Sequence, residues 1–117
     1  MKDMKAKVDD AMYRQCQSRG YTAPVDVLMD IGVLDRKKYE DWRMGRIPYL
    51  EAVCSGNLNK LSEMMKEIRR FAAQNGWKPS VKNYKHKSKQ LRFSKTGNPQ
   101  IEEAYSTHYL AEEKSES

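Results

Sequence analysis

The segment from Leu58 to Gln74 carries the most regular apolar pattern of the chain and constrains its fold most strongly. Apolar residues recur there at alternating spacings of three and four, at Leu58, Leu61, Met65, Ile68 and Ala72. This spacing places them along one side of an α-helix. Asn57 is a suitable N-cap residue, and Asn75-Gly76 is a suitable terminator. We therefore predict a helix over 58–74, with shorter elements packed on its apolar side.

Capping residues and glycines divide the preceding part of the chain into shorter helices. Side chains that accept hydrogen bonds from free N–H groups start helices, and glycine ends them in the left-handed conformation. The expected helices run from the cap Asp3 to about Arg19, from the cap Thr22 to Gly32, from the cap Asp35 to Gly45, and from Pro48 to Gly56. A last helix is expected from the cap Asn98, with Pro99 in its first position, to about Leu110.

The pattern changes after Gly76, where Leu91 and Phe93 alternate with polar residues in the manner of a strand. A lone strand is not stable, and the nearest partner is the segment 80–84, joined through a loop over 85–89. We therefore predict a basic β-hairpin. Two alternatives remain open: an ordered loop over 80–95 in an all-helical chain, and a segment that is disordered until it binds a partner.

Together these elements predict a mainly α fold of five to six short helices around one longer helix. A chain of 117 residues is one domain by length. We expect a helical domain over 1–110 with a basic hairpin or loop at 77–97, followed by an acidic flexible tail over 111–117. No apolar run approaches the roughly 20 residues that cross a bilayer, and the N-terminus lacks a secretion signal. We therefore expect no membrane partner and a cytoplasmic location.

The stretch from Arg69 to Lys95 carries nine Lys or Arg residues and no Asp or Glu, in a chain of net charge +6. Positive charge that cannot be neutralised locally must face water, an acidic segment or an external anion. A polyanion is the commonest external partner, because its binding releases counterions. The stretch therefore predicts contact with the phosphates of DNA or RNA.

The predicted function is nucleic-acid binding with little base-specific readout, and no enzymatic activity is expected. The expected phosphate-contacting residues are Arg69, Arg70, Lys78, Lys82, Lys85, Lys87, Lys89, Arg92 and Lys95. Trp77 and Tyr84 lie among them as candidates for stacking on bases. The alternative is a small adaptor or inhibitor that binds an acidic protein surface on a nucleic-acid-processing partner, with aromatic residues beside the cations as anchors.

Two local patterns resemble ligand sites but match them incompletely. Gly32 lies between two predicted helices as the turn glycine of a helix-turn-helix does, yet Leu28 stands where a small residue belongs, and Lys38 and Asp41 stand where apolar residues belong. The segment from Ser94 to Asn98 combines hydroxyls, an ammonium group and a helix start, which suits a phosphate. It lacks the glycine spacing of a P-loop, so we expect a capped turn there.

Metal, cofactor and catalytic chemistry have little support in the sequence. Cys16, Cys54, His86 and His108 are the possible metal ligands, and none are paired at zinc-like spacing. We expect both cysteines to be reduced and packed on helices. His108 is near Tyr105 and could act as a general base, but no carboxylate pair or nucleophile motif accompanies it. We therefore predict no metal, no cofactor and no catalytic residue.

Three strings of the chain resemble small bacterial proteins of unassigned function. They are Trp42-Arg43-Met44-Gly45-Arg46-Ile47-Pro48-Tyr49-Leu50-Glu51, Leu91-Arg92-Phe93-Ser94-Lys95-Thr96-Gly97 and Tyr105-Ser106-Thr107-His108-Tyr109. The resemblance extends from about Tyr21 to Leu110. It implies a bacterial or phage-like cytoplasmic setting, and it transfers no functional residue to this chain.

Overall fold

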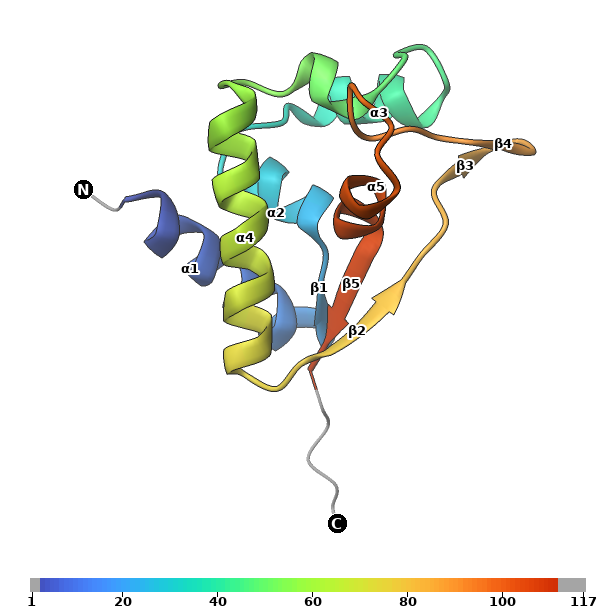
Figure 1. Cartoon of the computed structure of the whole chain (residues 1–117). Coiled ribbons are helices and arrows are strands. Elements are labelled where there is room, and N and C mark those ends of the chain that lie inside the picture. Colours follow the sequence, from blue (N-terminus) through green and yellow to red (C-terminus); the bar gives the residue numbers. More distant parts are fainter. Residues whose placement is uncertain (1–2, 112–117) are drawn as a thin grey trace.

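A computed structural model describes residues 3–111 of the chain and gives them a mainly helical fold with small antiparallel sheets (Figure 1). The elements are α1 (Met4–Arg19), β1 (Tyr21–Thr22), α2 (Pro24–Asp30), α3 (Arg36–Arg43), the 3-10 helix η1 (Leu50–Val53), α4 (Leu58–Gln74), β2 (Lys78–Val81), β3 (Lys85–His86), β4 (Lys89–Gln90), α5 (Pro99–Ser106) and β5 (Thr107–Leu110). The predicted acidic tail falls, beyond Ala111, outside the described residues.

The helices α1 and α4 pack against each other and form one side of the molecule (Figure 1). The side chain of Asp3 accepts a hydrogen bond from the Ala6 N–H, and Gly20 ends α1 with φ 84°. Asn57 caps α4 in the same way, by accepting from the Lys60 N–H. The predicted bounds of these two helices are confirmed, because both their caps and their apolar spacing are local features of the sequence.

A three-stranded antiparallel sheet with the order β1-β5-β2 closes the other end of the core. Leu110 of β5 pairs with Tyr21 on one side and with Lys78 on the other. The prediction that the last helix reaches Leu110 is therefore wrong, because α5 ends at Ser106 and the next four residues form β5. Thr107 and Tyr109 suit a strand, and pairing on both sides outweighs continuation of the helix.

The strand β2 pairs with β5 instead of with the predicted partner around Leu91. The Lys82 N–H donates to the Ser106 carbonyl at 3.0 Å, so the N–H groups of the even-numbered residues of this strand face β5. Pro79 lies at an outward-facing position, where its missing N–H costs no ladder bond. The prediction of a strand near residue 80 is correct, but its predicted pairing is wrong because the partner is distant in the sequence.

An aromatic cluster fills the core between α3, α5 and the segment 84–93. The Trp42 ring lies 5.0 Å from that of Phe93 and 5.7 Å from that of Tyr84, and Phe93 stacks on Tyr105 at 5.5 Å. The indole N–H of Trp42 donates to the Arg92 carbonyl at 2.7 Å. Ring packing and this buried hydrogen bond fix the chain on either side of the basic segment.

Three further local predictions need correction. Thr22 does not cap α2, because its hydroxyl hydrogen-bonds Gln15 and the N-cap position is held by Ala23. The predicted helix from Pro48 to Gly56 is only the 3-10 helix η1. Leu58 was expected on the buried side of α4 but is 51% exposed, so the apolar side of this helix extends beyond what the described chain covers.

Candidate nucleic-acid interface

The strands β3 and β4 form a two-stranded antiparallel ribbon that projects from the body of the protein (Figure 1). Lys85 pairs with Gln90 and His86 pairs with Lys89, and the turn between them consists of Lys87 and Ser88. Lys87 has φ 57°, which a tight turn between two strands requires at its first central position. We call Lys85, Lys87 and Lys89 the ribbon lysines. All three are exposed.

Tyr84 anchors the base of the ribbon in the core. Its ring packs on Trp42 and Phe93, its hydroxyl is 2.7 Å from Nε2 of His108, and its carbonyl accepts the Leu91 N–H at 2.8 Å. Only 8% of the residue is exposed, and burial raises the pKa of its phenol. The predicted role of Tyr84 in stacking on bases is therefore not supported, because its ring faces are covered.

The C-terminal turn of α3 lies against the ribbon and adds cations beside it. Cζ of Arg43 is 5.2 Å from the centre of the Tyr84 ring. Gly45 is so close to the ribbon that a Cβ there would be 3.2 Å from Cδ2 of His86. Arg46 has a carboxylate partner, because its guanidinium is 3.2 Å from Asp41. Arg43 is not among the phosphate-contacting residues predicted from the sequence, because its approach to Tyr84 depends on the tertiary packing.

Most cations around the ribbon lack a carboxylate partner within residues 3–111. Five exposed lysines form no ion pair with a described residue, namely Lys82, Lys85, Lys87, Lys89 and Lys95. Arg92 differs from them, because its guanidinium donates to the carbonyls of Ser94 and Lys95. Arg92 therefore orders the loop that follows it, and its remaining N–H groups are the ones that can meet an anion.

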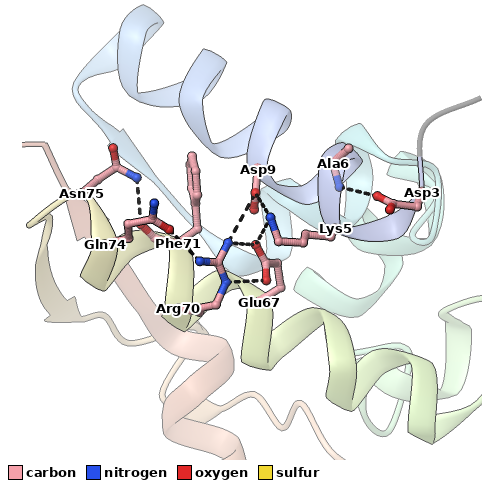
Figure 2. Close-up of polar contacts among 9 residues, drawn as sticks. All are labelled: Asp3, Lys5, Ala6, Asp9, Glu67, Arg70, Phe71, Gln74 and Asn75. Atoms are coloured by element: carbon pink, nitrogen blue, oxygen red, sulfur yellow. Dashed lines mark hydrogen bonds and ion pairs between the residues drawn. The ribbon is translucent and has the colours of Figure 1, made fainter.

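Arg69, Arg70 and Trp77 are well separated from the ribbon. The end of α4 and the tip of the ribbon lie on opposite sides of the molecule (Figure 1). Arg70 forms a bidentate pair with Glu67, at 2.6 and 2.8 Å, and reaches Asp9 at 3.6 Å (Figure 2). Trp77 packs edge-on against Phe71 at 5.6 Å. The predicted continuous track from Arg69 to Lys95 is therefore interrupted, and Arg70 is neutralised by carboxylates.

The carboxylates that hold Arg70 form a network between α1 and α4 (Figure 2). Asp9 accepts from Lys5 at 3.3 Å, but its Oδ1 is buried without a hydrogen-bond partner. Burial and the adjacent Glu67 raise the pKa of Asp9 to about 6. The hydrogen bonds from Arg70 lower the pKa of Glu67 to about 2. Glu67 is therefore ionised at low pH, whereas Asp9 keeps its proton to a higher pH.

Carboxylates hold the turn from Ser94 to Asn98 and accept the N–H groups of Ser94 and Lys95. Glu102 accepts hydrogen bonds from the Phe93 and Ser94 N–H groups and from the Ser94 hydroxyl. Glu51 accepts from the Lys95 N–H and from the Tyr105 hydroxyl. Negative charge occupies the position that an anion would need. The expectation of a capped turn agrees with this geometry.

The cysteines and histidines also occupy packed positions. Burial raises the pKa of the Cys16 thiol to about 11 and that of the Cys54 thiol to about 12, and both cysteines are free. His108 stacks on Tyr21 at 5.6 Å, and its nearest phenol is that of Tyr84 instead of the expected Tyr105. Within residues 3–111, no three His, Cys, Asp or Glu side chains are grouped as metal ligands would be.

Comparison of the chain with protein-family models, with curated proteins and with solved structures finds no match. Within residues 3–111, no helix has the length and apolar character required to cross a membrane.

Proposed function

We propose that the protein binds nucleic acid through phosphate contacts made by the ribbon and its flanks, with little readout of base sequence. The observation that carries this proposal is the set of exposed lysines without carboxylate partners in residues 3–111. The ribbon lysines form the centre of the surface, Lys82 and Lys95 flank it, and Arg43 adds a cation from α3. Arg70 takes no part because carboxylates hold it, and Arg69 lies on α4 away from the ribbon, in a hollow that Lys95 also lines.

The physical basis of the proposal is counterion release. Each ammonium group that neutralises a phosphate sets free condensed counterions, so affinity falls linearly with salt on a double-logarithmic scale. A two-stranded ribbon is also narrow enough to enter the major groove of a duplex. Since the ring of Tyr84 is buried in the core, base stacking contributes little. Binding should therefore depend on backbone charge much more than on base sequence.

The test is a salt series with ribbon variants. We would replace Lys85, Lys87 and Lys89 by glutamine and measure fluorescence anisotropy with labelled 20-nucleotide single-stranded and duplex DNA and RNA. The matched control replaces three exposed lysines on the helices, Lys7, Lys37 and Lys60. For duplex DNA, the slope of log K against log salt should become shallower by about 2.7 in the ribbon variant, at about 0.9 per lost contact, with little change in the control. Equal slopes for the wild type and the ribbon variant would refute the proposal.

A further inference from the structure

A long groove runs between α4 and the α5–β5 segment, away from the ribbon. Two adjoining hollows of about 430 Å³ and about 570 Å³ form it. They share lining residues from both walls, Met65 and Arg69 on α4 and Gln100 and Ala104 on α5. The groove therefore continues along α4 from Leu58 to Ala73, which is about 22 Å at 1.5 Å per residue.

The exposed surface of this groove is more apolar than polar, although Ile68 and Tyr109 in its lining are themselves buried. Its apolar residues are Leu58, Met65, Ile68, Ala73, Trp77, Ile101, Ala104 and Tyr109. Leu58 on α4 is 51% exposed, and Ile101 on α5 is 40% exposed. The apolar residues that predicted α4 thus lie in two different environments. Part of the apolar side packs in the core, and the remainder faces the groove.

Cations without a carboxylate partner in residues 3–111 border this apolar surface. Lys66, Arg69 and Lys95 line the first hollow. The one carboxylate there belongs to Glu51, and its two oxygens accept from the Lys95 N–H at 2.9 Å and from the Tyr105 hydroxyl at 2.7 Å. Arg69 contrasts with its neighbour Arg70, which Glu67 and Asp9 hold. The first hollow therefore presents positive charge beside apolar side chains, whereas the second hollow also holds the exposed carboxylate of Glu103.

We propose that this groove binds a short acidic amphipathic helix of a partner protein. Apolar side chains at positions i, i+3 or i+4, and i+7 of the partner would enter the groove, as in other helix-in-groove complexes. Its carboxylates would meet Lys66 and Arg69. The groove length corresponds to about four helical turns, which is longer than a compact small molecule needs. A nucleic acid would leave the apolar lining exposed to water. This inference does not involve the ribbon lysines, and Lys95 is the one residue shared by the groove and the proposed nucleic-acid surface.

The experiment selects 16-residue peptides from a random display library on the immobilised full-length protein. Counter-selection uses the Leu58→Glu/Ile101→Glu variant, whose two altered side chains are exposed on opposite walls of the groove. We expect the enriched peptides to contain an excess of Asp and Glu and apolar residues at helical spacing. Failure to enrich any peptide that distinguishes the two proteins would overturn the proposal, as would enriched peptides without an excess of acidic residues.

Binding of a selected peptide is then measured by fluorescence anisotropy. The groove variant should weaken binding at least about tenfold, as loss of central interface contacts does. The control Leu110→Glu changes a leucine of similar exposure outside the groove and should leave the affinity within about twofold. Arg69→Glu should weaken binding of the selected acidic peptide. Replacing the Glu residues of the peptide by Lys should restore its binding to the Arg69→Glu variant. An equal loss in the Leu110 control, or no rescue by charge exchange, would refute the proposal.

Discussion

Replacing Asp9 by asparagine should remove a contribution that lowers the stability of the wild type as the pH rises from 4 to 7.5. The buried Oδ1 of Asp9 lacks a hydrogen-bond partner, and Glu67 lies beside it. Burial and this neighbour raise the pKa of Asp9 from 3.8 to about 6. Ionisation of Asp9 is therefore less favourable in the folded protein than in the unfolded chain. Its stabilising contribution is complete below pH 3.8 and is lost as the pH rises through about 6.

The structure sets the magnitude of this effect. A rise of about 2 pKa units corresponds to about 3 kcal/mol at 1.36 kcal/mol per unit. The Asp9 side chain is 17% exposed at the edge of an open hollow, so water screens part of this energy and about 1 kcal/mol is expected. Glu67 has the opposite sign, because its pKa is lowered to about 2 and its contribution is lost only as the pH falls from 4.5 through about 2. Burial lowers the pKa of His108, which therefore also titrates between pH 4 and pH 7.5, but this contribution is common to both proteins and cancels in the difference between Asp9→Asn and the wild type.

The assay is urea unfolding of both proteins between pH 4 and pH 7.5, followed by the fluorescence of the two tryptophans, the buried Trp42 and the partly buried Trp77. The free energy of unfolding of Asp9→Asn, minus that of the wild type, should rise by about 1 kcal/mol from pH 4 to pH 7.5. Asp10→Asn is the matched control, since Asp10 is the next residue on α1 and pairs with Arg14 at 3.5 Å. A difference between Asp9→Asn and wild type that is constant over this range, or that falls with pH, would refute the reasoning.

Three further substitutions test the packing around the ribbon, each followed by urea unfolding. Glu102→Gln should lower the free energy of unfolding by about 2 kcal/mol, because it weakens three charge-assisted hydrogen bonds, from the Phe93 N–H, the Ser94 N–H and the Ser94 hydroxyl. The control is Glu103→Gln at the exposed neighbouring position, and equal losses in the two variants would contradict this role of Glu102. Trp42→Phe should cost about 2 kcal/mol, since part of the ring packing on Tyr84 and Phe93 is lost and the Arg92 carbonyl keeps only one of its two donors, the Leu50 N–H. A loss below about 0.5 kcal/mol would show that the indole contributes little beyond what a phenyl ring supplies. Gly45→Ala should lower the free energy of unfolding by about 1 kcal/mol more than Gly32→Ala does. Both glycines have positive φ, but only a Cβ at position 45 would contact the His86 ring. Equal losses in the two variants would mean that the His86 ring moves aside at no cost.

Helix caps and apolar spacing in the sequence predicted the bounds of the helices α1 and α4. Asp3 and Gly20 delimit α1, and Asn57 together with the 3-4 spacing delimits α4, because cap hydrogen bonds and apolar spacing act within a few residues. The strand β5 was missed because its partners Tyr21 and Lys78 are distant in the sequence. The periodicity of a short segment does not show which distant segments will pair with it as strands.

The segment from Leu91 to Phe93 also shows that a local pattern does not identify distant backbone partners. The predicted alternation is correct for burial, since Leu91 and Phe93 are buried and Arg92 is exposed. Their backbone partners are different from those expected, because the carbonyls of Arg92 and Phe93 accept N–H groups of Leu50 and Glu51 in η1. Alternation indicates which face is apolar, whereas the hydrogen-bonding partner depends on tertiary packing.

The candidate site was predictable in its charge but not in its geometry. An acid-free stretch is visible in the sequence, and the ribbon lysines within it are exposed without carboxylate partners in residues 3–111. The neutralisation of Arg70 is mainly due to Glu67, three residues earlier on α4, so the spacing of these two residues indicates it. The added contact of Arg70 with Asp9 and the burial of Tyr84 against Trp42 involve residues that are distant in the chain, so neither follows from composition or spacing.

The central position of β5 has a consequence for biosynthesis. Its residues, Thr107 to Leu110, are translated after every other element of the described chain, yet they lie between β1 and β2. While the ribosome is still making α5, the edges of β1 and β2 have no partner, although the helices can already collapse together. We expect nascent chains stalled before Thr107 to be cleaved readily by a protease near these edges, and full-length released chains to resist it.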